Sequence, residues 1–245
     1  MAELVHSGTY RAPERRASIF LSLNATAWAL IAMTLLVIAL GVFREWFVAR
    51  YGVETIFQDM RHIGLDQEMC LGSWYSASLL AVAAGFLFLI SRLAKEFGHR
   101  DVIYWTVLAI TFVGLSLDEE TSVHELVLEP IRNALHATGP FYFAWVIPAL
   151  VAVPLFGLAY VGFLKRLPKP YGLWFFVSGA IYVGGALGME MVGGVTYLTY
   201  GGDSLAYVAS FVTEESMEMI GATSFVIALM SYLRHIYALN LSYHA

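Results

Sequence analysis

Three carboxylates lie close together in an apolar segment near the end of the chain. Glu214, Glu215 and Glu218 interrupt a run that is otherwise apolar from Leu205 to Leu233. Residues three and four apart share one face of a helix, so Glu214 and Glu215 would each crowd Glu218. Carboxylates within an apolar spanning segment are costly and usually mark a functional site. Because like charges repel at this spacing, we expect a cation, protons or a partner base to compensate them.

A second group of ionisable side chains follows the third apolar segment. Asp118 begins an acidic stretch that includes Glu120 and is followed by His124. No proline intervenes before Pro130, so the helix is expected to continue through this stretch and to place Glu120 and His124 one turn apart. Three acids of this region are interpreted as lying at or beyond the membrane interface: Glu119, Glu125 and Glu129.

A single carboxylate, Glu190, interrupts the fifth apolar segment. It lies in a Met-Glu-Met pattern that recurs around Glu218, which suggests two similar carboxylate positions on facing helices. Ahead of Glu190, small residues recur at steps of four: Ala180, Gly184 and Gly188. Such a ridge allows a neighbouring helix to approach closely.

Taken together, these residues predict a site for one or two divalent metal ions. Carboxylate oxygens with an imidazole suit Zn, Mn or Fe, whereas Cu(I) prefers sulfur ligands. In this hypothesis a metal-bound water is the nucleophile, and the spare carboxylates Glu215 and Glu120 serve as catalytic acid or base. The predicted metal ligands are Asp118, His124, Glu190, Glu214 and Glu218.

Two other functions would use the same residues. Carboxyl groups that stay protonated would form a relay for protons or divalent cations, as in a transporter. Acids that face a basic partner would make the chain an accessory subunit of a larger membrane complex. A metal-dependent membrane hydrolase or oxidoreductase acting on a lipid-like substrate is the preferred hypothesis, followed by the accessory subunit. The transporter comes last because the acids lie in one half of the apolar segments. The opposite halves carry almost no ionisable residue that could continue a path across the membrane.

The composition places these residues in an integral membrane protein. Of 245 residues, 59% are hydrophobic and 13% are charged, whereas soluble domains carry about a quarter charged residues. The apolar runs approach the roughly 20 residues of a spanning helix and exceed the roughly 10 of a barrel strand. We therefore predict an all-α, polytopic protein with six transmembrane helices at about 25–43, 74–91, 102–117 (continuing to about 128), 141–164, 173–199 and 205–233.

The charges predict the orientation of the transmembrane domain, residues 25–238. The tails at 1–24 and 239–245, the second and fourth connections, and the C-terminal end of the sixth helix with Arg234 carry ten basic and four acidic residues. The opposite side carries four basic and fifteen acidic residues. By the positive-inside rule both termini are cytoplasmic (N-in/C-in), so the acidic loops lie outside the cytoplasmic (inner) membrane. The long first outer connection, about 44–72, has apolar residues at helical spacing, which predicts a short amphipathic helix on the interface: Val53, Ile56, Phe57, Met60 and Ile63.

Several familiar signatures are absent from the sequence. It has no Gly-rich phosphate loop, no Gly-x-Ser-x-Gly elbow and no Cys-x-x-Cys pair. The single cysteine, Cys70, excludes an intrachain disulfide. No nucleic-acid partner is expected. The expected partners are the lipid bilayer, a lipid substrate or other membrane subunits.

Overall fold

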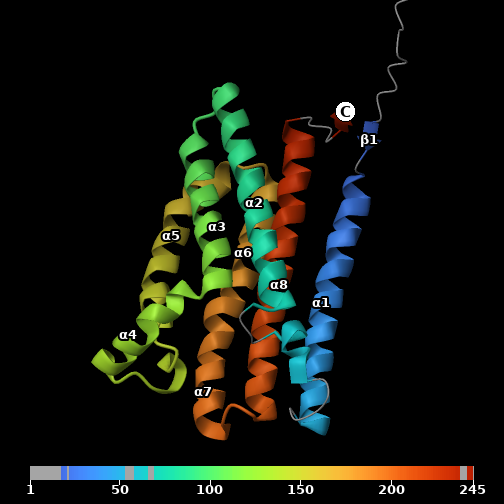
Figure 1. The fold of residues 1–245 in the computed structure, drawn as a ribbon. Coiled ribbons are helices and arrows are strands. Elements are labelled where there is room, and N and C mark those ends of the chain that lie inside the picture. Colours follow the sequence, from blue (N-terminus) through green and yellow to red (C-terminus); the bar gives the residue numbers. More distant parts are fainter. Residues whose placement is uncertain (1–17, 21, 53–57, 66–68, 238–241, 245) are drawn as a thin grey trace, which may run out of the picture.

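Six apolar helices dominate the computed structural model, which describes residues 18–20, 22–52, 58–65, 69–237 and 242–244 (Figure 1). Each is long and apolar enough to cross a membrane. This confirms the predicted all-α, six-helix membrane protein. The spans are α1 (Leu23–Tyr51), α2 (Leu71–Glu96), α3 (Val102–Thr121), α5 (Val146–Arg166), the combined α6 to α7 (Lys169–Tyr200) and α8 (Leu205–Ile236).

The N-terminal and C-terminal segments lie at the same end of the bundle (Figure 1). There β1 (Ser18–Phe20) pairs antiparallel with β2 (Ser242–His244). We refer to the opposite end, where α1, α7 and α8 turn, as the distal end. Which side of the membrane the distal end faces stays a prediction from the charge distribution.

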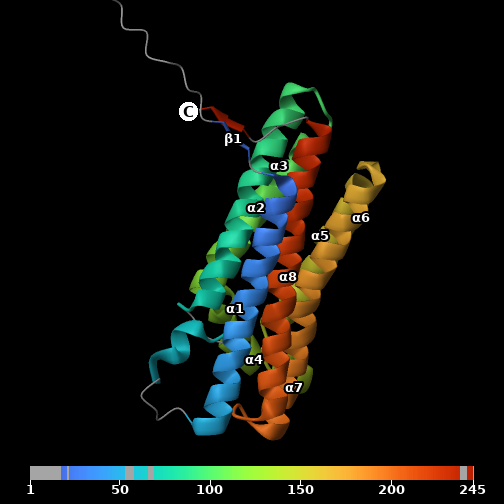
Figure 2. The same cartoon turned by 90° about the vertical axis from the view of Figure 1, so that its right-hand side faces the viewer.

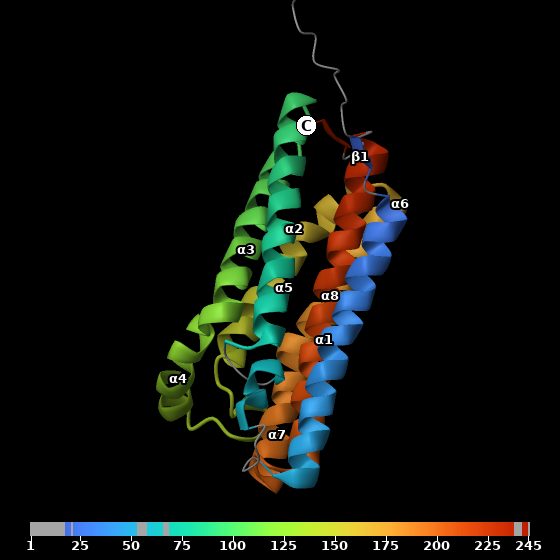
Figure 3. The ribbon, with the colours of Figure 1, turned by 45° about the vertical axis from the view of Figure 1, so that its right-hand side comes forward.

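Two helices, α2 and α8, form the centre of the bundle. Of the apolar stretch that qualifies each helix as a span, half is buried in α2 and two thirds in α8, against at most 22% in the other spans. Leu80, Leu87 and Ile90 of α2 are completely buried, as is Leu229 of α8. Figures 2 and 3 show α1 on one side of this pair and α3, α5 and α6 around the rest. The outward surfaces of the peripheral helices are apolar, as expected where they contact lipid.

The third span ends earlier than the sequence predicts. The expected continuation to about residue 128 is wrong, because α3 stops at Thr121 and Ser122 adopts a left-handed backbone with φ of 47°. The Asp118 side chain then accepts the backbone N–H of His124, which a continuing helix would have bonded to its own backbone. Three short elements follow: η2 (Val123–Val127), α4 (Leu128–Leu135) and η3 (Gly139–Phe141).

The first connection only partly tests the predicted interfacial helix. The α1 helix extends to Tyr51, and the described part of the connection holds a short 3₁₀ helix, η1 (Gln58–Ile63). Val53, Ile56 and Phe57 lie outside the described residues.

A π-helical turn interrupts the fifth span. This span consists of α6 (Lys169–Val183), the π-helix η4 (Gly184–Met189) and α7 (Glu190–Tyr200). The predicted ridge is only partly correct, because Gly184 approaches Met217 of α8 whereas a Cβ added at Gly188 would meet nothing within 4 Å. Gly185, beside Gly184, makes the closest approach to α8. Turns of this kind recur at functional sites, and here the turn leads directly into Glu190.

Candidate functional site

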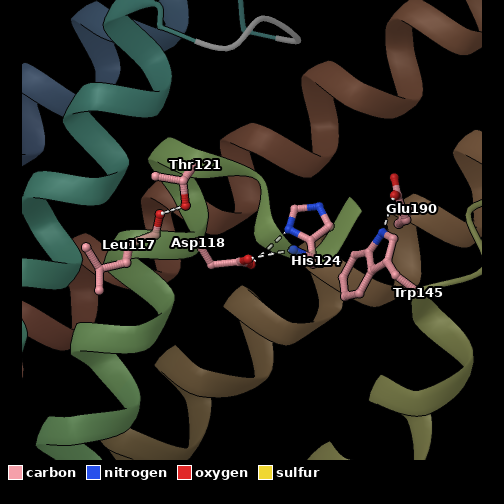
Figure 4. A network of polar contacts seen from close by, with 6 residues as sticks. All are labelled: Leu117, Asp118, Thr121, His124, Trp145 and Glu190. Atoms are coloured by element: carbon pink, nitrogen blue, oxygen red, sulfur yellow. Dashed lines mark hydrogen bonds and ion pairs between the residues drawn. The ribbon is translucent and has the colours of Figure 1, made fainter. Parts of the chain in front are cut away.

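Asp118 and His124 form a tight pair where α3 ends (Figure 4). The backbone N–H of His124 donates to Asp118 Oδ1 at 2.8 Å, and its ring Nδ1 lies 2.8 Å from Asp118 Oδ2. Two contacts to one carboxylate fix both the position and the rotation of the imidazole. In the neutral form of the ring, with Nδ1–H donating to Asp118, the second ring nitrogen, Nε2, carries the lone pair.

The charges around His124 favour its protonated form. Burial acts to lower the pKa of His124, but the hydrogen bond to Asp118 and the negative charges of Asp118, Glu125 and Glu190 act the other way. The net effect raises the pKa of His124 above its ordinary value. Since its side chain is 32% exposed, the imidazole can exchange protons with its surroundings.

Trp145 connects this pair to the fifth span. Its ring packs against the His124 ring with centroids 4.7 Å apart, and its Nε1–H donates to Glu190 Oε1 at 2.8 Å. Figure 4 shows His124 between Asp118 on one side and Trp145 on the other. Side chains from α3, the segment before α5 and α7 are therefore joined in one continuous contact.

The π-helix places Glu190 against the first acids of α8. The carboxyl groups of Glu190 and Glu214 make a hydrogen-bond contact. A Cβ on Gly185 would lie 2.9 Å from the Glu214 carbonyl oxygen and 3.1 Å from Glu218 Cγ. Only a glycine allows the two helices to come this close, so Gly185 determines the spacing of the carboxylates.

Glu218 lies deeper and has different neighbours. It is 8% exposed, and at 1.5 Å per residue it lies about 20 Å along α8 from Leu205. Its strongest electrostatic neighbour is Glu119 of α3, followed by Glu215 and Glu190, and Tyr182 of α6 also interacts with its carboxyl group. Glu119, interpreted from the sequence as an interfacial acid, thus interacts with the interior of the bundle.

Two polar atoms of this region are buried without a hydrogen-bond partner in the described part of the chain. One is Ser76 Oγ on α2, whose residue is fully buried. Ser76 faces the Glu119 carboxyl group, although not in ordinary hydrogen-bond geometry. The other is Oε2 of Glu120, in the last turn of α3.

The predicted ligands do not form one metal centre. Within the described residues, no group of three or more His, Cys, Asp or Glu side chains is arranged to hold a metal ion. Contacts link Asp118 to His124 and Glu190 to Glu214, with Trp145 between the two pairs. Metal binding by these residues stays a prediction, as do the catalytic roles of Glu215 and Glu120.

Four residues of this region are not predicted as site residues by the sequence. Trp145 fits an interfacial aromatic belt equally well, and Ser76 and Tyr182 resemble many other hydroxyls in the spans. Glu119 follows Asp118 directly, and its inward direction depends on where α3 ends. Of the small-residue ridge predicted from the sequence, Gly184 lies at a close helix contact here, whereas Gly185, which makes the closest approach, is not part of that ridge.

The chain matches a family model described as a domain of unknown function, DUF8692, over residues 15–233. No match was found among curated proteins or among solved structures. The matched range includes every residue named in this site. Because it covers most of the 245 residues, the chain belongs to the DUF8692 family.

Proposed function

We propose that the protein is a membrane hydrolase that cleaves an ester-type bond in a lipid-like substrate by acid–base catalysis. The observation that carries this proposal is the Asp118–His124 pair with its link through Trp145 to Glu190. A histidine held at Nδ1 by a carboxylate presents Nε2 as a general base, and this arrangement recurs in unrelated hydrolases.

The roles of the residues follow from their contacts. His124 Nε2 takes a proton from water, which attacks the carbonyl carbon of the substrate. The bond from that carbon to the leaving oxygen then breaks. The Glu190–Glu214 contact supplies the proton for the leaving oxygen, since a hydrogen bond between two carboxyl groups requires a proton on one of them.

The location suits a substrate that arrives from the bilayer. In Figure 1, α3 ends well short of the distal ends of α7 and α8, so the connecting segment that follows Thr121 begins beside these spans rather than beyond them. Nearby side chains of the connecting segment are apolar and exposed, among them Val123 at 52% and Leu126 at 74%. Apolar surface beside a polar site supports the binding of an acyl chain next to a reactive head group. With the orientation predicted from the charges, the site faces the extracytoplasmic leaflet.

Transport receives less support from the structure. Residues 103–117 of α3, 170–189 of α6 and η4, and 219–233 of α8 contain no Asp, Glu, Lys, Arg or His. These stretches therefore offer no ionisable side chain that could pass protons or cations from the acids to the end of the bundle where β1 and β2 lie.

The test uses full-length protein in nanodiscs that contain mixed phospholipids, with lipid products followed by mass spectrometry. We expect product release by the wild type and a loss of about 10²–10⁴-fold in His124→Gln, the range typical of a missing general base. Glu129→Gln is the matched control, since Glu129 is 77% exposed on the same connecting segment. Equal turnover by wild type and His124→Gln, or no turnover of any lipid, would contradict the proposal.

A further inference from the structure

A fully buried hydroxyl without a partner lies in the middle of the bundle. Ser76 of α2 is 0% exposed, and its Oγ makes no hydrogen bond within the described residues. Several other hydroxyls in the spans are paired, such as Ser91 with Thr106 at 2.6 Å, whereas Thr26 Oγ1 of α1 is likewise buried without a partner in the described chain. Leaving a hydroxyl without a partner in a membrane interior is costly, so its position calls for a further ligand.

Oxygen atoms from three other helices surround this hydroxyl. Ser76 faces Glu119 of α3, and Glu119 is the strongest electrostatic neighbour of Glu218 of α8. Tyr182 of α6 completes the set through its contact with Glu218, and its electrostatic neighbours also include Glu119. Four helices thus each direct one oxygen-bearing side chain to one region.

Among the described residues, no arginine or lysine is a strong electrostatic neighbour of these acids, and His124 alone brings a basic side chain near Glu119. The strongest electrostatic neighbours of Glu218 among the described residues include three acids and no arginine or lysine. His124 interacts with Glu119, but its Nδ1 is already held by Asp118. Two carboxylates so placed repel one another unless a cation lies between them or one of them is protonated.

We propose that Ser76, Glu119, Tyr182 and Glu218 form a binding site for one hard divalent cation. All four donors are oxygens, which suits Mn²⁺, Ca²⁺ or Mg²⁺. Two carboxylates balance a charge of two, and the neutral Ser76 and Tyr182 oxygens supply further ligands.

This site differs from the metal centre expected from the sequence. It shares only Glu218 with the predicted ligands and includes neither His124 nor Glu190. In the described chain, no group of three or more His, Cys, Asp or Glu side chains is arranged to hold a metal. The proposed site is of another kind, because it combines two carboxylates with two hydroxyls. It is also independent of the proposed hydrolase chemistry, which uses His124.

The test is a titration of the full-length protein in nanodiscs with Mn²⁺, with free Mn²⁺ measured by electron paramagnetic resonance. We expect one saturable Mn²⁺ per chain, displaced by excess Ca²⁺ or Mg²⁺. Glu119→Gln should weaken binding by more than about tenfold, and Ser76→Ala by about tenfold. Glu129→Gln, which removes an exposed acid, should bind Mn²⁺ as the wild type does.

Two results would overturn the proposal. One is the absence of saturable Mn²⁺ binding in the wild type, which would leave protons as the compensating charge. The other is unchanged binding in both Glu119→Gln and Ser76→Ala. The Ser76→Ala variant guards against misfolding of the glutamine variant, since it removes a single oxygen and leaves the surrounding apolar packing intact.

Discussion

Two polar groups occupy neighbouring positions on the same central helices, and they are built in opposite ways. In the first, Thr34 of α1 lies 2.8 Å from the Tyr75 hydroxyl and 2.7 Å from Thr223 Oγ1. Thr34 and Tyr75 also contact the Leu30 carbonyl, at 2.9 and 3.3 Å. Every side chain in this group is neutral and partnered.

The second group begins one residue further along α2. Ser76 is unpartnered within the described chain, and the region that it faces contains Glu119 and Glu218, whose like charges repel. Neutral hydroxyls that satisfy one another hold helices together at little cost. Acids in the same surroundings are costly, so their presence points to a role outside folding. The difference distinguishes a satisfied structural contact from the acidic group to which we assign the proposed cation site.

The largest effect is expected from breaking the helix contact that lies between the two groups. A Cβ on Gly221 would lie 2.7 Å from the Tyr182 backbone nitrogen and 2.9 Å from the Ser178 carbonyl oxygen, and neither backbone atom can move aside easily. Gly221→Leu should force α6 away from α8 and lower the free energy of unfolding by about 3 kcal/mol. Detergent-induced unfolding measures this.

The matched control for that variant is Gly188→Leu, because nothing lies within 4 Å of a Cβ at Gly188. Its stability should stay within about 1 kcal/mol of the wild type, the cost of altering a helical glycine. Equal losses in the two variants would show that the close α6–α8 approach does not hold Tyr182 at the acids.

An intermediate effect, of opposite sign in the two groups, should follow from replacing their polar side chains with apolar ones. Thr34→Val removes partnered hydrogen bonds and should destabilise the protein by about 1 kcal/mol. Glu218→Met removes a buried acid with a side chain of similar size and should stabilise the protein by about 1–3 kcal/mol when divalent cations are chelated. Unfolding in the presence of a chelator measures both. Destabilisation by both variants would mean that Glu218 is a structural residue.

The smallest effect is a pH dependence that belongs to His124. Because folding raises its pKa, protonated His124 stabilises the fold fully below about pH 6.5, and this contribution disappears as the pH rises through the raised value. His124→Gln should remove this change, about 2–4 °C in Tm between roughly pH 5 and pH 9. His136→Asn is the control, since His136 lies on the same connection with a positive φ of 49°, which asparagine tolerates. A wild-type pH profile in His124→Gln would assign the effect to other groups.

Much of the fold follows from local patterns. Six apolar runs of spanning length predict six helices, and all six are present because each helix must satisfy its own backbone in lipid. The alternation of basic and acidic connections predicts that the first and last helices have their outer ends on the same side. In agreement, β1 and β2 lie together at one end of the bundle. The two Met-Glu-Met segments lie on adjacent helices, since Glu190 interacts with Glu214 and Glu218 of α8, but the carboxyl groups of Glu190 and Glu218 have different neighbours and do not form two similar positions.

The wrong predictions concern places where the helix departs from regular α-helical geometry. The α3 helix ends at Thr121, and the backbone N–H of His124 donates to the Asp118 side chain. Glu120 and His124 are therefore not one turn apart on a common helix, as the sequence predicts. The predicted glycine ridge is wrong at Gly188 because the π-helix changes which residues face α8. Neither event has a signature in hydrophobic periodicity.

From its residues alone, the chain determines that it lies in a membrane, which segments cross it and which segments carry acids. These properties depend on composition and short-range spacing, because each helix meets the lipid separately. The tertiary structure alone decides that Glu119 interacts with Glu218 rather than lying at the interface, that Trp145 joins His124 to Glu190, and that Ser76 has no hydrogen-bond partner in the described chain. Those relations depend on the end of α3, the π-turn before Glu190 and the close approach at Gly185 and Gly221, which only the packed bundle sets.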